Sequence, residues 1–428
     1  MIRLSTSSAE FEGAFTALVN ARRETDADVS RDVAAIIADV KARGDIAVAE
    51  YTATFDGHDL AATGWRIPRA ECDAALANLA PELRSALELA ERRIRTYHES
   101  QRPVNTDTTD SAGVRLGARW RGVDAAGIYV PGGRAAYPSS VLMNAIPAKV
   151  AGVARLVMVT PTPKGEINPL VLAAAALAGV DEVWRIGGAQ AVAALAYGTD
   201  TIAAVDVITG PGNAWVAEAK RQLYGVVGID MVAGPSEILV VADADNNPDW
   251  IAIDLLSQAE HDPTSQSILL TDDAAFADKV ATALETRLLT LTTQATARAS
   301  WEANGAIIVL ADLNEAPALI NRLAPEHLEI ATADPERLFG DVRHAGSVFL
   351  GRYTPEAVGD YVAGPNHVLP TGRRARFASG LSVLDFMKRT SFLSCDAAAI
   401  SAIGPAAVAL ASAEGLPAHA ASVAVRLT

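Results

Sequence analysis

The spacing of apolar residues divides the chain into a helical N-terminal part and a longer part in which strands and helices alternate. Residues 29–51 carry apolar side chains at the spacing of one helix face, namely Val33, Ile36, Ile37 and Val40. Gly44 is a possible end of this helix. Residues 82–98 form a second long amphipathic run. We therefore predict mainly helices up to about residue 115.

From residue 125 short apolar runs alternate with alanine-rich helical runs. The strand-like runs are 127–130, 156–159, 182–186 and 205–208, and the helical runs between them are 141–153, 170–177 and 189–196. Apolar strands joined by helices predict a parallel sheet that is covered on both faces.

The same alternation repeats from residue 237. The strand-like runs here are 237–241, 267–270, 306–310, 328–330 and 347–350, and the predicted connecting helices are 248–260, 273–289, 312–323 and 334–343. We therefore predict an α/β protein with two tandem units that meet near residues 233–236. Ligands of such folds collect at the carboxyl ends of strands and in the cleft between units.

A small C-terminal piece remains beyond residue 380. Pro405 suits the first position of a helix and Gly415 its end. The apolar stretch 397–413 is short for a membrane span and predicts a buried helix, and residues 421–427 predict a final strand. We expect this piece to pack on a neighbouring subunit.

Composition excludes several classes of protein. The 428 residues suffice for two to four domains, and a hydrophobic content of 50% with 20% charged residues is typical of a globular protein. The net charge of -15 argues against a nucleic-acid partner. The two cysteines, Cys72 and Cys395, can build neither a disulfide framework nor a Cys-type zinc site, and the N-terminus shows no apolar signal segment. We expect a cytoplasmic protein without a membrane partner.

Four glycine-rich segments follow strands of the first unit: 131–133, 187–190, 210–213 and 233–236. Glycine allows the backbone to approach a ligand closely, and a helix that starts after such a loop offers free N–H groups to a phosphate. None matches Gly-x-Gly-x-x-Gly. Any one of them could be a plain turn, but the side chains of Tyr129, Gln190 and Asn213 favour contact with a ligand.

The second unit carries an adjacent acid and imidazole, Glu326 and His327. A carboxylate and an imidazole are the usual pair for moving protons near neutral pH. A helix-ending turn with a solvated glutamate explains the same spacing equally well.

A metal site can be assembled from residues that lie far apart in the chain. Gln258 and His261 fall on one face of a predicted helix, although most histidines in such a pair are structural. Asp360 lies with His367 in a loop rich in glycine and proline, and His419 follows the last predicted helix. Together Gln258, His261, Asp360 and His419 offer two nitrogen and two oxygen donors, a set suited to zinc or another first-row divalent ion.

At these residues the sequence resembles the histidinol dehydrogenase family over nearly its whole length. Several motifs in fixed order carry the resemblance: Tyr-Val-Pro-Gly-Gly (129–133), Gly-Gly-Ala-Gln (187–190), Gly-Pro-Gly-Asn (210–213), Ala-Gly-Pro-Ser-Glu (233–237), Gln-Ala-Glu-His (258–261), Pro-Glu-His-Leu (325–328), Gly-Asp-Tyr (359–361), Gly-Pro-Asn-His-Val-Leu-Pro-Thr (364–371) and Glu-Gly-Leu-Pro-Ala-His (414–419).

The resemblance implies two incomplete Rossmann-like domains of the aldehyde-dehydrogenase kind, with a helical N-terminal and a small C-terminal domain. The expected division is an arm of residues 1–25, a metal and acid/base domain of 26–124 plus 237–380, an NAD domain of 125–236, and a C-terminal domain of 381–428 that reaches the partner subunit. The implied enzyme is a homodimer with shared active sites. It holds one Zn²⁺ per subunit and oxidises L-histidinol through L-histidinal to L-histidine with two NAD⁺, the last steps of histidine biosynthesis.

The resemblance also implies a role for each candidate residue. The implied zinc ligands are Gln258, His261, Asp360 and, from the partner subunit, His419; the acid/base pair is Glu326 and His327; the NAD contacts are Tyr129, Gln190 and Asn213. The implied substrate contacts are Ser236, His327, His367, Glu414 and the zinc ligands.

The chemistry of these residue types agrees with the implied reaction. His327 can take the hydroxyl proton as a hydride leaves, and Glu326 can activate the water that the aldehyde step needs, since neither cysteine lies in a chemical motif. One alternative is a related dehydrogenase of another polar alcohol, such as a sulfonated diol; Glu414 beside His419 argues for a cationic amine instead. A zinc hydrolase is a second alternative, but the sequence contains no His-Glu-x-x-His helix. A non-catalytic binding protein is a third, but it would not need an acid, a base and metal ligands together.

Overall fold

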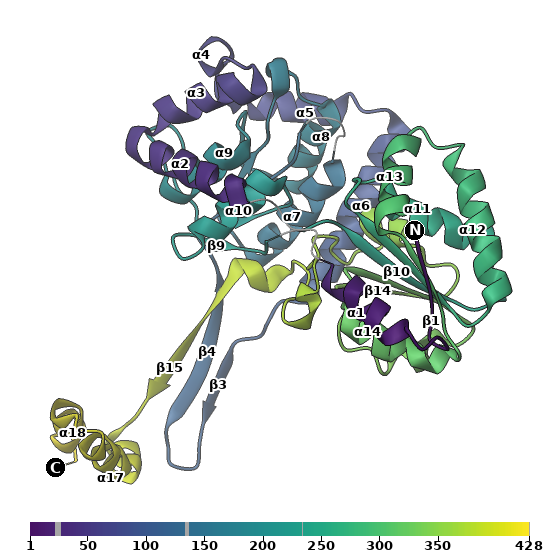
Figure 1. Cartoon of the computed structure of the whole chain (residues 1–428). Helices are drawn as coiled ribbons and strands as arrows, with labels where there is room; N and C mark the ends of the chain where they lie inside the picture. The colour runs from purple at the N-terminus through teal and green to yellow at the C-terminus, as the bar shows by residue number, and fades with distance from the viewer. Residues whose placement is uncertain (22–26, 133–136, 233, 428) are drawn as a thin grey trace.

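The chain folds into two α/β units and an antiparallel ribbon that projects from them (Figure 1). The computed structural model describes residues 1–21, 27–132, 137–232 and 234–427. Residues 22–25 of the expected N-terminal arm lie outside the described residues, as do Gly133 and Ala233 of two glycine-rich segments.

The first unit is built on a six-stranded sheet in the order β2-β7-β6-β5-β8-β9. Its strands are β2 (Arg66–Ile67), β5 (Ala125–Tyr129), β6 (Arg155–Val159), β7 (Glu182–Trp184), β8 (Val207–Thr209) and β9 (Gly228–Ile229), and its connecting helices are α7 (Pro138–Ala151), α8 (Pro169–Ala178), α9 (Gly188–Tyr197) and α10 (Ala214–Leu223). All pairs are parallel except β2 with β7. Every residue of β5 is buried, because helices cover both faces of the sheet. The predicted alternation is confirmed here.

The second unit is built on a six-stranded parallel sheet in the order β1-β12-β11-β10-β13-β14. Its strands are β1 (Ile2–Ser5), β10 (Glu237–Ala242), β11 (Gln266–Thr271), β12 (Ala306–Val309), β13 (His327–Ala331) and β14 (Ser347–Leu350), and its helices are α1 (Phe11–Asn20), α11 (Pro248–Ala259), α12 (Ala274–Leu288), α13 (Gln294–Asn304), α14 (Ala316–Leu323), α15 (Pro335–Phe339) and α16 (Glu356–Tyr361). Apolar side chains on the two faces of this sheet form two separate cores. The five predicted strands of this unit are confirmed, and β1 joins them from the other end of the chain.

The N-terminal region is helical, as predicted, apart from short strands. Its helices are α2 (Ala27–Arg43), α3 (Asp45–Asp56), α4 (Leu60–Thr63), α5 (Arg69–Ala77) and α6 (Pro81–Glu99). Gly44 separates α2 from α3 with a φ of 54°, in the region that favours glycine. Apolar residues of α2, α3, α5 and α6 belong to the two cores of the first unit. The domain division expected above stays a prediction.

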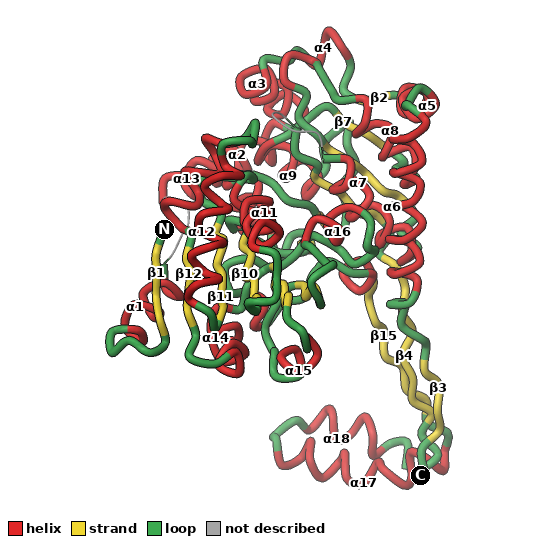
Figure 2. Tube along the Cα trace, turned by 90° about the vertical axis from the view of Figure 1, so that its right-hand side faces the viewer, coloured by secondary structure: helices red, strands yellow, loops and turns green. Residues whose placement is uncertain are grey.

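The ribbon consists of β3 (Thr106–Thr109), β4 (Arg115–Gly122) and β15 (Met387–Ser394), and it carries α17 (Ala397–Ala413) and α18 (Pro417–Ala424). Figures 1 and 2 both show α17 and α18 at the far end of the ribbon, away from the two units. Among the described helices, none is long and apolar enough to cross a membrane.

Three predictions for the C-terminal piece are wrong. Pro405 lies inside α17 rather than at its start. Residues 417–424 form a helix in place of the predicted strand, because Pro417 occupies the first turn and Val423 packs beside Gly404 of α17. The predicted burial of α17 fails within one chain, where Leu410 is 66% exposed.

Candidate active site

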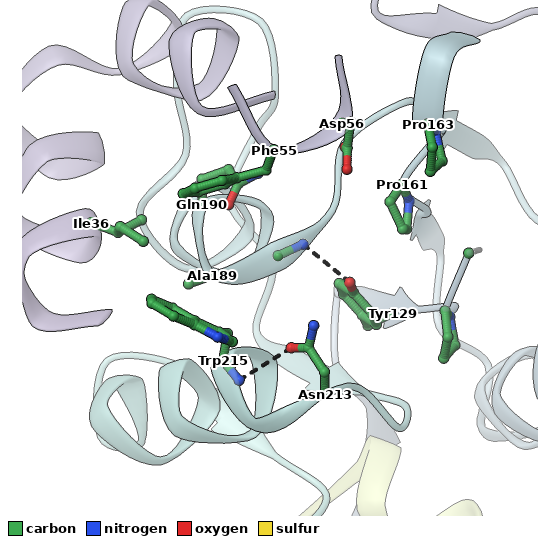
Figure 3. Close-up of a pocket in the computed structure, with 13 residues that line it drawn as sticks. Ile36, Phe55, Asp56, Tyr129, Pro161, Pro163, Ala189, Gln190, Asn213 and Trp215 are labelled. Atoms are coloured by element: carbon green, nitrogen blue, oxygen red, sulfur yellow. Dashed lines mark hydrogen bonds between the residues drawn. The ribbon is translucent and has the colours of Figure 1, made fainter. Parts of the chain in front are cut away.

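A cavity of about 450 Å³ lies at the carboxyl ends of β5, β7 and β8 in the first unit. Figure 3 shows its lining, to which the three residues predicted to contact NAD all contribute: Tyr129, Gln190 and Asn213. The cavity therefore lies at the edge of the sheet where ligands are expected to collect.

Two of these three side chains also have structural roles. The Tyr129 hydroxyl accepts a hydrogen bond of 3.1 Å from the Gly188 amide at the start of α9. Asn213 caps α10, because its Oδ1 accepts from the backbone amides of Trp215 at 3.1 Å and Val216 at 3.2 Å. This capping leaves the Asn213 amide nitrogen available to a ligand.

Gln190 has no such structural explanation. Its side chain is 1% exposed, and its Oε1 atom has no hydrogen-bond partner. A buried amide oxygen without a partner is costly, so a ligand donor is expected there.

Burial raises the pKa of Tyr129 to about 12, which keeps its hydroxyl protonated and able to donate.

The cavity fits a dinucleotide. Helices α9 and α10 begin at its wall, and the N–H groups of their first turns that do not bond to Tyr129 or Asn213 suit phosphates. Apart from Asp56, its remaining described walls are mainly apolar and aromatic, and its volume lies in the range of ligand pockets. Gly210 must stay a glycine, since its φ is 112° and an added Cβ would lie 2.2 Å from the Tyr129 carbonyl oxygen.

A second cluster surrounds His327, the first residue of β13. Its Nδ1 lies 3.0 Å from the Glu237 carbonyl oxygen and 3.1 Å from Gln258 Oε1. Two acceptors at Nδ1 place the proton on that nitrogen, which makes Nε2 the basic atom. Nε2 has no hydrogen-bond partner, and burial lowers the pKa of His327 to about 4 although Asp360 raises it. The ring is therefore a neutral base at pH 7.

Helix α16 supplies two acids to this cluster, Glu356 and Asp360, one turn apart. Glu356 Oε1 lies 3.3 Å from His327 Nδ1, and Asp360 Oδ1 lies 3.9 Å from His327 Nε2. Asp360 Oδ1 is also 3.9 Å from Nδ1 of His367, a predicted substrate contact. Burial, followed by the charge of Asp360, raises the pKa of Glu356 well above its usual range. Sequence reasoning missed Glu356; its only signal was the i, i+4 spacing to Asp360.

The cluster fits a divalent cation. Possible donor atoms of His327, Glu356 and Asp360 lie within 4.8 Å of one another, and Glu356 Oε2 has no hydrogen-bond partner. The Gln258 amide donates to His261 Nδ1 over 3.1 Å, so the two predicted ligands lie together, but α11 ends at Ala259 and His261 lies beyond the helix on which it was predicted. Carboxylate, amide and imidazole donors of this kind suit zinc and related ions.

Glu326 is buried, so the alternative of a solvated turn residue is wrong. Its Oε2 accepts from the Glu237 amide at 2.9 Å and lies 3.7 Å from His327 Nδ1. Ser236 directly precedes Glu237 in the chain, at the start of β10. The predicted acid and base therefore lie together.

The remaining predicted site residues, Glu414 and His419, are not brought to this cluster within one chain. Both are exposed, and they belong to the α17–α18 piece at the end of the ribbon (Figure 2). The structure thus brings Gln258 and Asp360 to His327, and His261 to Gln258, but leaves the predicted fourth metal ligand remote.

The His327 cluster lies at the amino ends of β10 and β13, contrary to the expectation of carboxyl ends. A cavity of about 140 Å³ opens beside it between β14, α16 and residues 363–369. This loop contacts the first unit, because the Asn366 amide donates to the Met143 carbonyl oxygen of α7 at 2.6 Å and Arg93 Nη2 of α6 donates to the Ala363 carbonyl oxygen at 3.0 Å.

Comparison with known proteins agrees with this arrangement. The family model described as histidinol dehydrogenase matches residues 19–427. Histidinol dehydrogenases of Zymomonas mobilis and Rhodospirillum rubrum are 66% and 64% identical to the chain, over 100% of it and 99% and 98% of their own lengths. The crystal structure of histidinol dehydrogenase from Elizabethkingia anophelis superposes with a TM-score of 0.95 at 37% identity, and covers 100% of this chain and 98% of that one. The chain belongs to the histidinol dehydrogenase family.

Proposed function

We propose that the protein is an NAD-linked dehydrogenase that oxidises L-histidinol through L-histidinal to L-histidine. The observation that carries the proposal is His327, a buried neutral imidazole whose unpartnered Nε2 faces the cluster of candidate metal donors. The cavity lined by Tyr129, Gln190 and Asn213 supplies a site for the hydride acceptor. We place this activity in the cytoplasm, in histidine biosynthesis.

In the first oxidation His327 Nε2 takes the hydroxyl proton of the substrate while a hydride passes to NAD⁺. The Nδ1 proton, shared with the Glu237 carbonyl oxygen, holds the ring in the tautomer that this step requires. The Glu356 carboxyl lies 3.3 Å from Nδ1 and is protonated, because burial raises its pKa well above the usual range; it can ionise when the ring gains its positive charge.

In the second oxidation water adds to the aldehyde carbon, and the resulting hydrate loses a second hydride to another NAD⁺. His327 first releases to solvent the proton that it took in the first oxidation. Glu326 accepts a proton from the attacking water, and His327 then takes the hydroxyl proton of the hydrate. Cys72 is buried and Cys395 lies at the end of the ribbon, so neither is offered as a nucleophile.

Gln258, His261 and Asp360 would hold a zinc ion, with His419 from a partner subunit and Glu356 as a further donor. Bound there, the metal would anchor the imidazole and amino nitrogens of histidinol and orient its hydroxymethyl group. Ser236, His367 and Glu414 would complete the substrate contacts.

We further propose a homodimer in which each ribbon carries Glu414 and His419 to the other subunit's site. The exposed apolar residues on this piece support the proposal, since they are left uncovered in a single chain: Ile403, Leu410, Leu416 and Val425.

The first test is the number of NADH molecules formed per L-histidinol consumed, with zinc and then with a chelator. Two NADH per substrate, lost on chelation, are expected. If one NADH forms per substrate and the aldehyde accumulates, the role proposed for Glu326 is wrong. If no NADH forms, the proposed reaction is wrong.

A mixing experiment tests the shared site. His419→Asn and His327→Asn subunits, each inactive alone, are refolded together. If His419 serves the partner, each heterodimer regains one intact site, and random pairing restores about a quarter of the wild-type activity. No recovery in verified heterodimers would place His419 in its own chain's site.

A further inference from the structure

Asp56 is the one charged side chain among the described residues that line the cofactor cavity. It is the last residue of α3, and Figure 3 shows its carboxylate directed toward Tyr129. Its Oδ2 atom is buried and has no hydrogen-bond partner.

The fold gives no reason for a carboxylate at this point. The end of a helix carries a partial negative charge, so an acid in the last turn of α3 is unfavourable. A buried oxygen without a donor adds to that cost. Both effects disfavour an acid at position 56, and a ligand that donates hydrogen bonds would compensate for them.

The neighbouring side chains indicate which part of a ligand would lie there. Ile36, Phe55 and Trp215 gather at one end of the cavity in Figure 3 and offer an apolar, aromatic slot for a planar base. Because Phe55 and Asp56 are adjacent in the chain, a base beside Phe55 brings its ribose toward Asp56. A carboxylate accepts hydrogen bonds from both hydroxyls of a ribose, and it repels a phosphate attached to one of them.

We propose that Asp56 binds the ribose hydroxyls of the adenosine half of the cofactor and excludes dinucleotides with a 2′-phosphate. This inference rests on the dinucleotide site of the proposed function and adds the residue that selects NAD⁺ over NADP⁺. Asp56 is a specificity residue and takes no part in proton transfer.

The test is calorimetric titration of NAD⁺ and NADP⁺ into the whole protein without histidinol, so that binding is read independently of turnover. Burial raises the pKa of the Asp56 carboxyl, and the titrations are therefore made at pH 8. The variants are Asp56→Asn and, as a matched control on the same helix, Glu50→Gln, which removes an exposed acid outside the cavity.

Wild-type protein and Glu50→Gln are expected to bind NAD⁺ at least about tenfold more tightly than NADP⁺. In Asp56→Asn the ratio should approach one, through weaker NAD⁺ binding and tighter NADP⁺ binding. An unchanged ratio in Asp56→Asn, an equal loss for both dinucleotides, or no preference in the wild type would each overturn the inference. If the wild type binds neither dinucleotide, the cavity is not the cofactor site of the proposed function, and the inference about Asp56 fails with it.

Discussion

The carboxyl group of Glu356 faces the ring of His327, with Oε1 3.3 Å from the nitrogen that carries the proton. Both side chains are buried, so their interaction is weakly screened. This contact joins α16 to β13 and ties the base to a second acid that is remote from it in sequence.

Glu356→Gln replaces a carboxyl group, which can ionise when the ring of His327 becomes charged, with an amide that cannot, while it keeps the shape of the side chain. We expect kcat for NADH formation to fall by roughly 10- to 100-fold with KM for histidinol little changed. Steady-state kinetics with zinc in excess measure both constants. Glu336→Gln, an exposed acid on α15, is the control, and a variant with wild-type kcat would contradict the role of Glu356.

The pH dependence of kcat/KM reports the state of His327. Its pKa is lowered to about 4 by burial, so the ring stays unprotonated, and able to accept a proton, at any pH well above that value. We expect the acid limb of the profile to lie near pH 4 rather than at the ordinary histidine value. Circular dichroism at each pH separates this limb from unfolding, and a limb near pH 6.5 in folded protein would count against the assignment.

The buried pair of Asp254 and Glu329 makes stability depend on pH with a definite sign. Burial raises the pKa of Asp254 to about 6 and that of Glu329 well above its usual range. The folded chain therefore keeps protons that the unfolded chain releases. The stabilisation is full below the unfolded pKa values, near pH 4, and is lost as pH rises through the folded ones.

Glu329→Gln removes one of these acids. Its free energy of unfolding at pH 8 should exceed that of the wild type by roughly 1–3 kcal/mol, with a smaller difference at pH 5. Urea unfolding at the two pH values measures it, beside Glu285→Gln as an exposed control. If the variant is less stable than the wild type at pH 8, the interaction between Asp254 and Glu329 stabilises the fold, and this prediction is wrong.

Metal removal should act on stability as well as on turnover. Because a ligand that binds only the folded state stabilises it, chelation should lower the melting temperature of the wild type by several degrees. Asp360→Asn should melt at the same temperature with and without chelator, while Cys72→Ser should keep the wild-type response. An equal response in Asp360→Asn would exclude Asp360 as a ligand.

Lys220 and Asp230 form a buried ion pair that fixes the loop before Asn213. Lys220 Nζ donates to the Gly210 carbonyl oxygen at 2.9 Å, and Asp230 accepts from the Gly210 amide at 2.8 Å. Lys220→Met leaves a buried charge unpaired and should cost about 3–5 kcal/mol of stability and raise KM for NAD⁺. The double variant with Asp230→Asn should recover part of the stability in urea unfolding; no recovery would mean that packing, and not charge, is lost.

Periodicity predicted both sheets because their strands are buried on both faces. Every residue of β10 and of β13 is buried, which produces the continuous apolar runs that the sequence displays. The ribbon has no such signal, since every residue of β3 is exposed and β4 pairs with a strand at the other end of the chain. The ribbon forms through pairing between segments far apart in the sequence, and no local pattern of residues predicts that pairing.

The candidate site was predictable where residues fall into motifs. Gln258 and His261 lie together, although His261 follows the end of α11, and Glu326 adjoins His327 in the chain. Glu356 stands in no motif and becomes visible only when α16 lies against β13. The roles proposed for Glu414 and His419 depend on a second chain, so they remain predictions.

The pairing of early with late strands has a consequence for synthesis of the protein. Residues 115–122 of β4 pair with residues 387–394 of β15, and β1 pairs with β12. At ribosomal rates of about 5–20 residues per second, β4 waits roughly 15–60 seconds for its partner. One long edge of the β3–β4 hairpin stays open throughout that interval, so the nascent chain, more than the finished enzyme, is the form that needs protection from aggregation.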